Sequence, residues 1–168
     1  KKLLGGFSII LVTIIGYLSI KEVREQRKIK LANQFNITVI NFKIEEKQTT
    51  INQLTKMINE NDATYSPLAL YFLIDNNLIK NKETINSLFD ELINETTLDE
   101  EITNLIIYKK ALFNSDFSSE SDLLQILNPI INSESIWKSH SLYLLGEYFY
   151  SKSEKQKSKE FFNQILTL

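Results

Sequence analysis

Hydrophobic residues follow two different patterns along this chain. Residues Leu3 to Ile20 form one uncharged stretch of 18 positions, of which 12 are Leu, Ile, Val, Phe or Tyr. Beyond residue 30, apolar residues recur at intervals of three and four, the spacing of one face of an amphipathic helix. The chain is therefore expected to form one long apolar helix followed by a series of amphipathic helices.

The apolar stretch is just long enough to cross a membrane. Eighteen helical residues rise about 27 Å, and the hydrocarbon core of a bilayer is about 30 Å thick. The alternatives are a buried core helix and a cleaved secretory signal. A signal peptide needs small residues at its cleavage site, whereas this stretch ends with bulky Tyr17, Leu18 and Ile20. We therefore expect an uncleaved single-pass anchor over residues 3–20 and a separate domain over residues 21–168.

Helix start signals divide that domain into segments. A Ser or Thr followed three residues later by Gln, Glu or Asp is a capping-box spacing, and Ser66-Pro67 is typical of an N-cap followed by the first helical residue. Pro129 is expected to end or kink the helix in which it lies. The capping-box spacings begin at Thr50, Thr97, Ser119 and Ser151. The expected helices cover residues 21–42, 50–58, 66–75, 85–92, 97–113, 119–129, 137–150 and 155–168.

The composition supports an all-α fold. Four Gly and two Pro are too few for the many turns of a β-sandwich or barrel. The helix starts near residues 66, 97 and 135 are about 31 to 38 residues apart, which lies in the range of two-helix repeats. Because a single hairpin cannot bury its apolar face, we expect about four hairpins to stack as an α-solenoid.

Charge and side-chain chemistry exclude several function classes. Of the 19 Lys and Arg residues, 12 lie beyond residue 30, together with 19 of the 21 acidic residues. The resulting net charge of −7 argues against a nucleic-acid partner. The single histidine, His140, has no Cys and no second His with which to form a metal site. We expect neither an enzyme nor a bound cofactor or metal.

Two acidic clusters, Asp90-Glu91 and Asp99 to Glu101, have structural explanations. The second cluster lies in the first turn of an expected helix, where negative charge favours the positive end of the helix dipole. Neither cluster has the residue spacing of a calcium-binding loop. We therefore expect both clusters to be structural.

The last hairpin resembles the tetratricopeptide repeat. Small Gly146 and Ser158 stand where the two helices of such a repeat approach closely, with Phe149 and Phe162 filling the adjoining gaps. The residues that carry this resemblance are Leu142, Leu145, Gly146, Phe149, Ser158, Phe162 and Ile165.

The arrangement of the whole chain is similar to a bacterial membrane-anchored tetratricopeptide-like family that includes the ancillary subunit of the Sec (SecYEG) translocon. The resemblance rests on the anchor, the degenerate repeats behind it and the stretch from Ser135 to Ser141. It implies location in the bacterial inner membrane, a periplasmic repeat domain, and partners that are translocon subunits, chaperones or peptide segments. The charge count, with two basic residues before the apolar stretch and five after it, indicates the opposite topology. We follow the family because the sequence, which begins with Lys1 and stops in mid-pattern at Leu168, is expected to be a fragment.

The tetratricopeptide resemblance also implies a partner-binding groove in the last hairpin, formed by His140, Tyr143, Glu147 and Tyr150. These positions share one helix face, and tyrosines often anchor protein interfaces. The alternative is that the tyrosines pack against a further helix beyond Leu168. The expected function is a membrane-tethered adaptor for protein partners, and the alternative is the extracytoplasmic helical sensor region of a membrane receptor.

Overall fold

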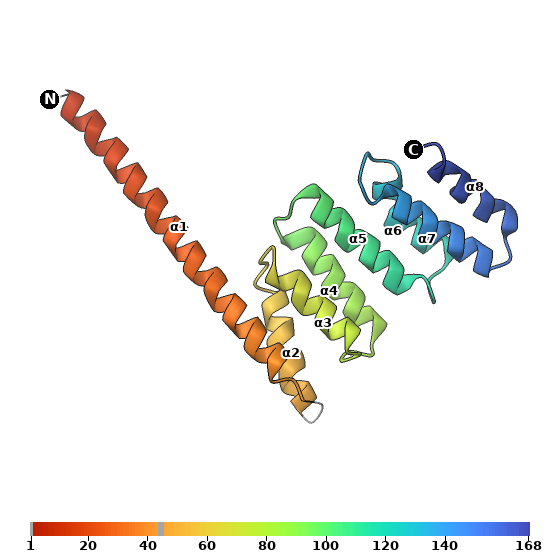
Figure 1. Ribbon diagram of the computed structural model, residues 1–168. Coiled ribbons are helices and arrows are strands. Elements are labelled where there is room, and N and C mark those ends of the chain that lie inside the picture. Colours follow the sequence, from red (N-terminus) through yellow and green to blue (C-terminus); the bar gives the residue numbers. More distant parts are fainter. Residues whose placement is uncertain (1, 44–45) are drawn as a thin grey trace. The chain divides into compact units, whose positions relative to one another are not determined.

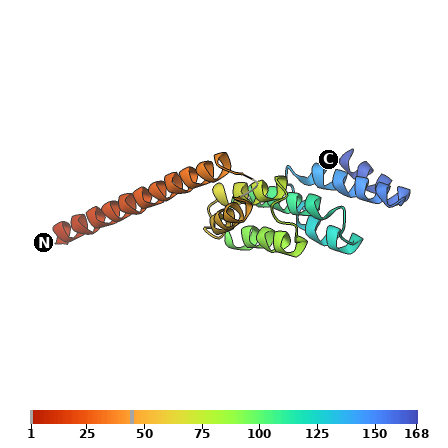
Figure 2. The same cartoon turned by 90° about the horizontal axis from the view of Figure 1, so that it is seen from below.

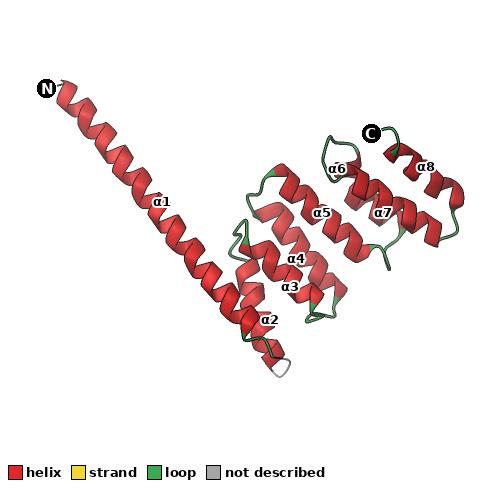
Figure 3. Ribbon diagram, in the orientation of Figure 1, coloured by secondary structure: helices red, strands yellow, loops and turns green. Residues whose placement is uncertain are grey.

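A computed structural model describes the backbone of residues 2–43 and 46–168 and the side chains of residues 11–43 and 46–168. Over these residues the chain forms helices and no strand (Figures 1 and 3), so the predicted all-α class is confirmed. The helices are α1 (Lys2–Ile40), α2 (Lys47–Ile58), α3 (Tyr65–Asp75), α4 (Lys82–Glu95), α5 (Glu100–Asn114), α6 (Glu120–Ile131), α7 (Lys138–Ser151) and α8 (Lys155–Ile165).

The helices form two compact units. Unit 1 covers Lys1–Leu73 and unit 2 covers Ile74–Leu168. Each unit has its own buried core, and each is described by itself.

In unit 1, α1 is an unbroken helix of 39 residues (Figures 1 and 2). The apolar stretch and the residues after it therefore belong to one helix. Every residue from 11 to 30 is exposed, and burial begins at Leu31, which is 4% exposed. From Leu31 onward α1 packs against α2, where Leu54 and Ile58 are fully buried. Side-chain burial thus fixes only the last ten residues of α1, 31–40.

Several predicted helix starts are wrong. The second helix begins at Lys47 and not at Thr50, because Thr50 is buried inside α2 at 4% exposure. Ser66 is not an N-cap: its hydroxyl donates to the Met57 carbonyl oxygen at 2.7 Å, while Asp62 accepts the backbone N–H groups at the start of α3. In these cases a side chain that could cap a helix is used in tertiary packing.

The other start signals gave mixed results. Thr97 does not open α5, whose N-cap is Asp99. Ser119 does cap α6, as predicted, and exchanges hydrogen bonds with Asp122. Residues Ser151 to Glu154 form the predicted turn, although no side-chain bond caps α8. The sixth helix ends two residues after Pro129.

Tyr71 of α3 gives unit 1 a pH-dependent stability. Burial raises the pKa of Tyr71 from 10.0 to about 12. Between pH 10 and 12 the hydroxyl therefore ionises in the unfolded chain but stays neutral in the folded one, so the folded state loses stability as pH rises. A shift of two units corresponds to about 2.7 kcal/mol, and because Tyr71 is only half-buried we expect a loss of about 2 kcal/mol.

This prediction can be checked by ultraviolet absorbance at alkaline pH. The titration curve of the wild-type chain should contain a late step of Tyr71 at about pH 12, and Tyr71→Phe should remove that step. The difference in unfolding free energy between wild type and Tyr71→Phe should also change across this pH range. A variant that leaves the titration curve unaltered would contradict the assignment.

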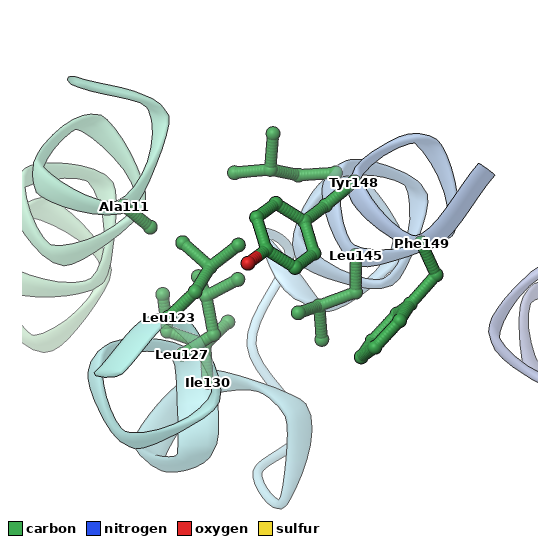
Figure 4. Packing of buried hydrophobic residues seen from close by; sticks show 8 residues of the cluster. Ala111, Leu123, Leu127, Ile130, Leu145, Tyr148 and Phe149 are labelled. Atoms are coloured by element: carbon green, nitrogen blue, oxygen red, sulfur yellow. The ribbon is translucent and has the colours of Figure 1, made fainter. Parts of the chain in front are cut away.

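In unit 2, each helix from α4 to α8 packs against the next in the chain, and α5 also contacts α7. The core between α5, α6 and α7 is built around Leu127, Leu145 and Phe149, and Figure 4 shows the Tyr148 ring pointing from α7 toward α6. The Tyr148 hydroxyl donates to the Ser118 carbonyl oxygen at 3.1 Å. The cluster consists of Ala111, Leu123, Leu127, Ile130, Leu144, Leu145, Tyr148 and Phe149.

The close approach predicted at Gly146 is confirmed. A Cβ atom at Gly146 would lie 2.5 Å from Cε1 of Phe162, so only glycine lets the Phe162 ring of α8 lie against α7. Ser158 is buried at 3% exposure, and the Phe149 ring stacks on Phe161 with ring centres 5.4 Å apart. Lys157 of α8 binds Glu120 of α6 at 2.9 Å and thereby links the last hairpin to its neighbour.

Candidate partner-binding surface

The predicted groove residues lie on one exposed stripe of α7. His140, Tyr143, Glu147 and Tyr150 are all exposed, with Tyr143 at 55% and Tyr150 at 62%. They are the only exposed residues between positions 140 and 150, because the positions between them are buried in the core of unit 2. The helical spacing of three and four residues is therefore what separates this stripe from the core-facing side of α7.

Aromatic rings from neighbouring helices extend this stripe. The ring of Tyr108 on α5 stacks on Trp137, with centres 5.7 Å apart, and the His140 ring lies 5.3 Å from Trp137. The Tyr143 ring lies 5.6 Å from Phe162 of α8. We call these five residues, Tyr108, Trp137, His140, Tyr143 and Phe162, the aromatic surface.

Hydrogen bonds hold the α5 end of the aromatic surface in place. The indole N–H of Trp137 donates to the backbone carbonyl of Glu101 at 3.1 Å. The Ser135 hydroxyl donates to the Glu101 carboxylate at 2.7 Å and accepts the backbone N–H of Trp137 at 3.1 Å. Because these bonds fix the Trp137 ring, the surface has little side-chain entropy to lose when a partner binds.

The electrostatics of the surface are simple. Glu147 is the one charged residue on the exposed stripe of α7. Burial raises the pKa of Tyr108 further above its ordinary value of 10.0, and its hydroxyl is a neutral donor and acceptor at physiological pH. The surface can therefore form ring contacts and neutral hydrogen bonds with an apolar or aromatic segment of a partner.

One residue of each acidic cluster makes a contact between helices or loops of the fold. Asp90 accepts an ion pair from Lys110 at 2.6 Å, which joins α4 to α5. Glu101 holds Ser135, as described above. Over the side chains that the structure describes, no group of three or more His, Cys, Asp or Glu residues is placed to hold a metal ion.

Sequence reasoning missed Tyr108, Trp137 and Phe162 as members of this surface. Nothing in the spacing along the chain joins Tyr108 to Trp137, since 29 positions separate them. The available signal was the expected packing of alternate helices in a repeat array, which brings α5 beside α7. Tyr143 packs on Phe162, a residue of α8.

The predicted anchor falls partly outside the described side chains. Residues 3–10 of the segment Leu3 to Ile20 lie in the part of the chain whose side chains are not described. Among the described residues, no helix combines the length and the apolarity that crossing a bilayer requires.

Comparisons with known proteins add no relative: the sequence matches no protein-family model, and neither the curated proteins nor the solved structures gave a match.

Proposed function

We propose that this chain is a membrane-tethered, tetratricopeptide-like helical adaptor that binds protein partners through the aromatic surface of unit 2. The observation that carries the proposal is the exposure of Tyr143 and Tyr150 on the stripe of α7 that begins at His140, whose ring contacts Trp137 and Tyr108. Aromatic side chains dominate the binding energy of many protein interfaces, and a fixed ring loses little entropy on binding.

The proposal also includes two structural features of the chain: a stack of about four helical hairpins and a membrane tether. Residues 11–20 of α1 support the tether, because large apolar side chains there are 50% to 69% exposed and contiguous apolar surface of this kind marks membrane or protein contact. These side chains are Leu11, Val12, Ile14, Ile15, Tyr17, Leu18 and Ile20. Tethering would raise the local concentration of a partner in the same membrane, so that micromolar contacts suffice.

Location and partner class follow from the resemblance to the membrane-anchored tetratricopeptide-like family. They are the bacterial inner membrane, a periplasmic repeat domain, and translocon subunits, chaperones or peptide segments as partners. A topology reporter fused after Leu168 tests the location, and signal on the cytoplasmic side would reverse it.

The proposed interface can be tested by cross-linking and co-purification from detergent-solubilised membranes. The double variant Tyr143→Ser with Tyr150→Ser should reduce recovery of translocon or chaperone partners at least about tenfold, because two exposed aromatic anchors are lost. Both side chains are more than half exposed, so Trp137 emission and the melting temperature should change little. The matched control is Ile40→Ser, which removes an apolar side chain of unit 1 that is 79% exposed and should leave recovery unchanged. Equal recovery with the double variant and the wild type would refute the role of the surface.

A second candidate is the extracytoplasmic sensor region of a membrane receptor. The unbroken α1 favours it, because a continuous helix of 39 residues can carry a displacement from the domain to the membrane segment. That function requires a cytoplasmic effector domain encoded ahead of Lys1. The full-length gene therefore separates the two candidates.

A further inference from the structure

Unit 1 contains a cavity that the proposed function does not use. Its volume is about 470 Å³, and it lies between α1 and α2 on the side lined by Arg27, Lys30, Leu31, Lys56 and Met57. Cavities of about 300 to 1,000 Å³ are typical of binding sites. We call it the α1–α2 groove.

The groove is elongated along the helix axes. Its lining residues recur every three or four positions from Arg27 to Thr38 on α1 and from Gln53 to Glu60 on α2. The two helices are antiparallel, since Arg27 bonds Glu60 while Thr38 bonds Gln53. From residue 27 to residue 38 the axis of α1 rises about 16 Å, which equals three turns of a helix. A third helix fits a groove of this shape, as in the recognition of amphipathic helices by helical domains.

The charges of the groove define the chemistry of its occupant. Glu60 already neutralises Arg27 through an ion pair of 2.8 Å. Lys30 and Lys56 stand on opposite helices, both exposed, and neither has an ion-pair partner among the described residues. Leu31 and Met57, which are 4% and 5% exposed, line the groove together with the polar side chains of Gln34, Thr38 and Gln53. Two free positive charges on a partly apolar lining are complementary to an amphipathic helix that carries carboxylates beside its apolar face.

The distance from the expected membrane boundary favours a protein segment over a lipid head group. Lys30 lies ten residues beyond Ile20 on the same unbroken helix, about 15 Å along its axis. The head-group layer is only about 5 to 7 Å thick on each side of a bilayer. With an anchor that ends at Ile20, as proposed above, the groove opens in the aqueous phase beyond the head groups, where a soluble segment can reach it.

We propose that the α1–α2 groove binds an acidic amphipathic helix of a partner protein, with carboxylates on Lys30 and Lys56 and apolar side chains on Leu31 and Met57. This site lies in unit 1 and is independent of the aromatic surface in unit 2.

The probe for this site is a fluorescein-labelled peptide of 14 residues, with Leu at positions three and four apart and Glu on both flanks. Its binding to the full chain in nanodiscs of zwitterionic lipid is measured by fluorescence anisotropy. The comparison peptide carries Gln in place of Glu. The Glu peptide should bind about tenfold more tightly, because two partly exposed ion pairs contribute a factor of this size. The advantage should shrink at high salt.

Variants assign the effect to the groove. Lys30→Gln with Lys56→Gln should abolish the preference for the Glu peptide. The matched control is Lys28→Gln, an equal charge change at an exposed position of α1 that does not line the groove. It should retain the preference, as should Tyr143→Ser with Tyr150→Ser. Equal binding of both peptides, or an unchanged preference in the double lysine variant, would overturn the proposal. The proposal would also be overturned if the double lysine variant weakened binding of the Glu peptide only when the nanodiscs contain anionic lipid.

Discussion

Phe149→Ala is expected to destabilise unit 2 by about 3 to 5 kcal/mol, most of the stability of a small domain. Phe149 is 1% exposed and belongs to the core cluster shared by α5, α6 and α7 (Figure 4). Its ring also stacks on Phe161 of α8. Truncation would leave a cavity in this core and would remove the stacking contact with α8.

The measurement is urea unfolding of the full chain in mild detergent, followed by the fluorescence of Trp137, the only tryptophan. Trp137 lies in unit 2, so it reports the unit that is altered. The neighbouring substitution Tyr150→Ala is the control, because that side chain is 62% exposed. It should change the unfolding free energy by less than about 0.5 kcal/mol. Similar losses in both variants would show that the predicted core face of α7 is wrong.

Gly146→Leu should destabilise unit 2 by about 3 kcal/mol, through overpacking. The first added atom would lie 2.5 Å from the Phe162 ring, and the remaining atoms of leucine need the space that this ring occupies. Either Phe162 leaves its site or α8 moves away from α7. Gly146→Ala is milder, because the same overlap is partly offset by the gain of about 1 kcal/mol in helix propensity.

A double-mutant cycle tests this cause directly. In the Phe162→Ala background the overlap is gone, so Gly146→Ala should stabilise the domain by up to about 1 kcal/mol. A loss of the same size in both backgrounds would mean that Phe162 is not the group that requires glycine. The unfolding free energy is again measured by Trp137 fluorescence.

The helical class and the stripe on α7 could be predicted because both depend on local periodicity. In α7 the positions 140, 143, 147 and 150 alternate with apolar ones at helical spacing, so the exposed side could be identified from the sequence. The small residue at 146 was interpreted through the resemblance to the tetratricopeptide repeat, because the side chain that requires glycine there, Phe162, lies on the next helix.

Capping signals were less informative because tertiary contacts compete for the same side chains. Thr50 and Ser66 are residue types that often cap helices. Thr50 is buried in α2, however, and the Ser66 hydroxyl donates a hydrogen bond to the Met57 carbonyl oxygen. Ser119, which has no such competing contact, caps its helix as predicted.

The sequence by itself determined that this chain is helical and which positions of α7 face outward, because these follow from interactions within about one helical turn. Only the tertiary structure decided which helices are neighbours. That choice brings Phe162 against Gly146 and Tyr108 onto Trp137, and it places Lys30 and Lys56 on the lining of one groove. Such juxtapositions join residues 16 to 29 positions apart, and they arise from the packing of whole helix faces, which no local pattern specifies.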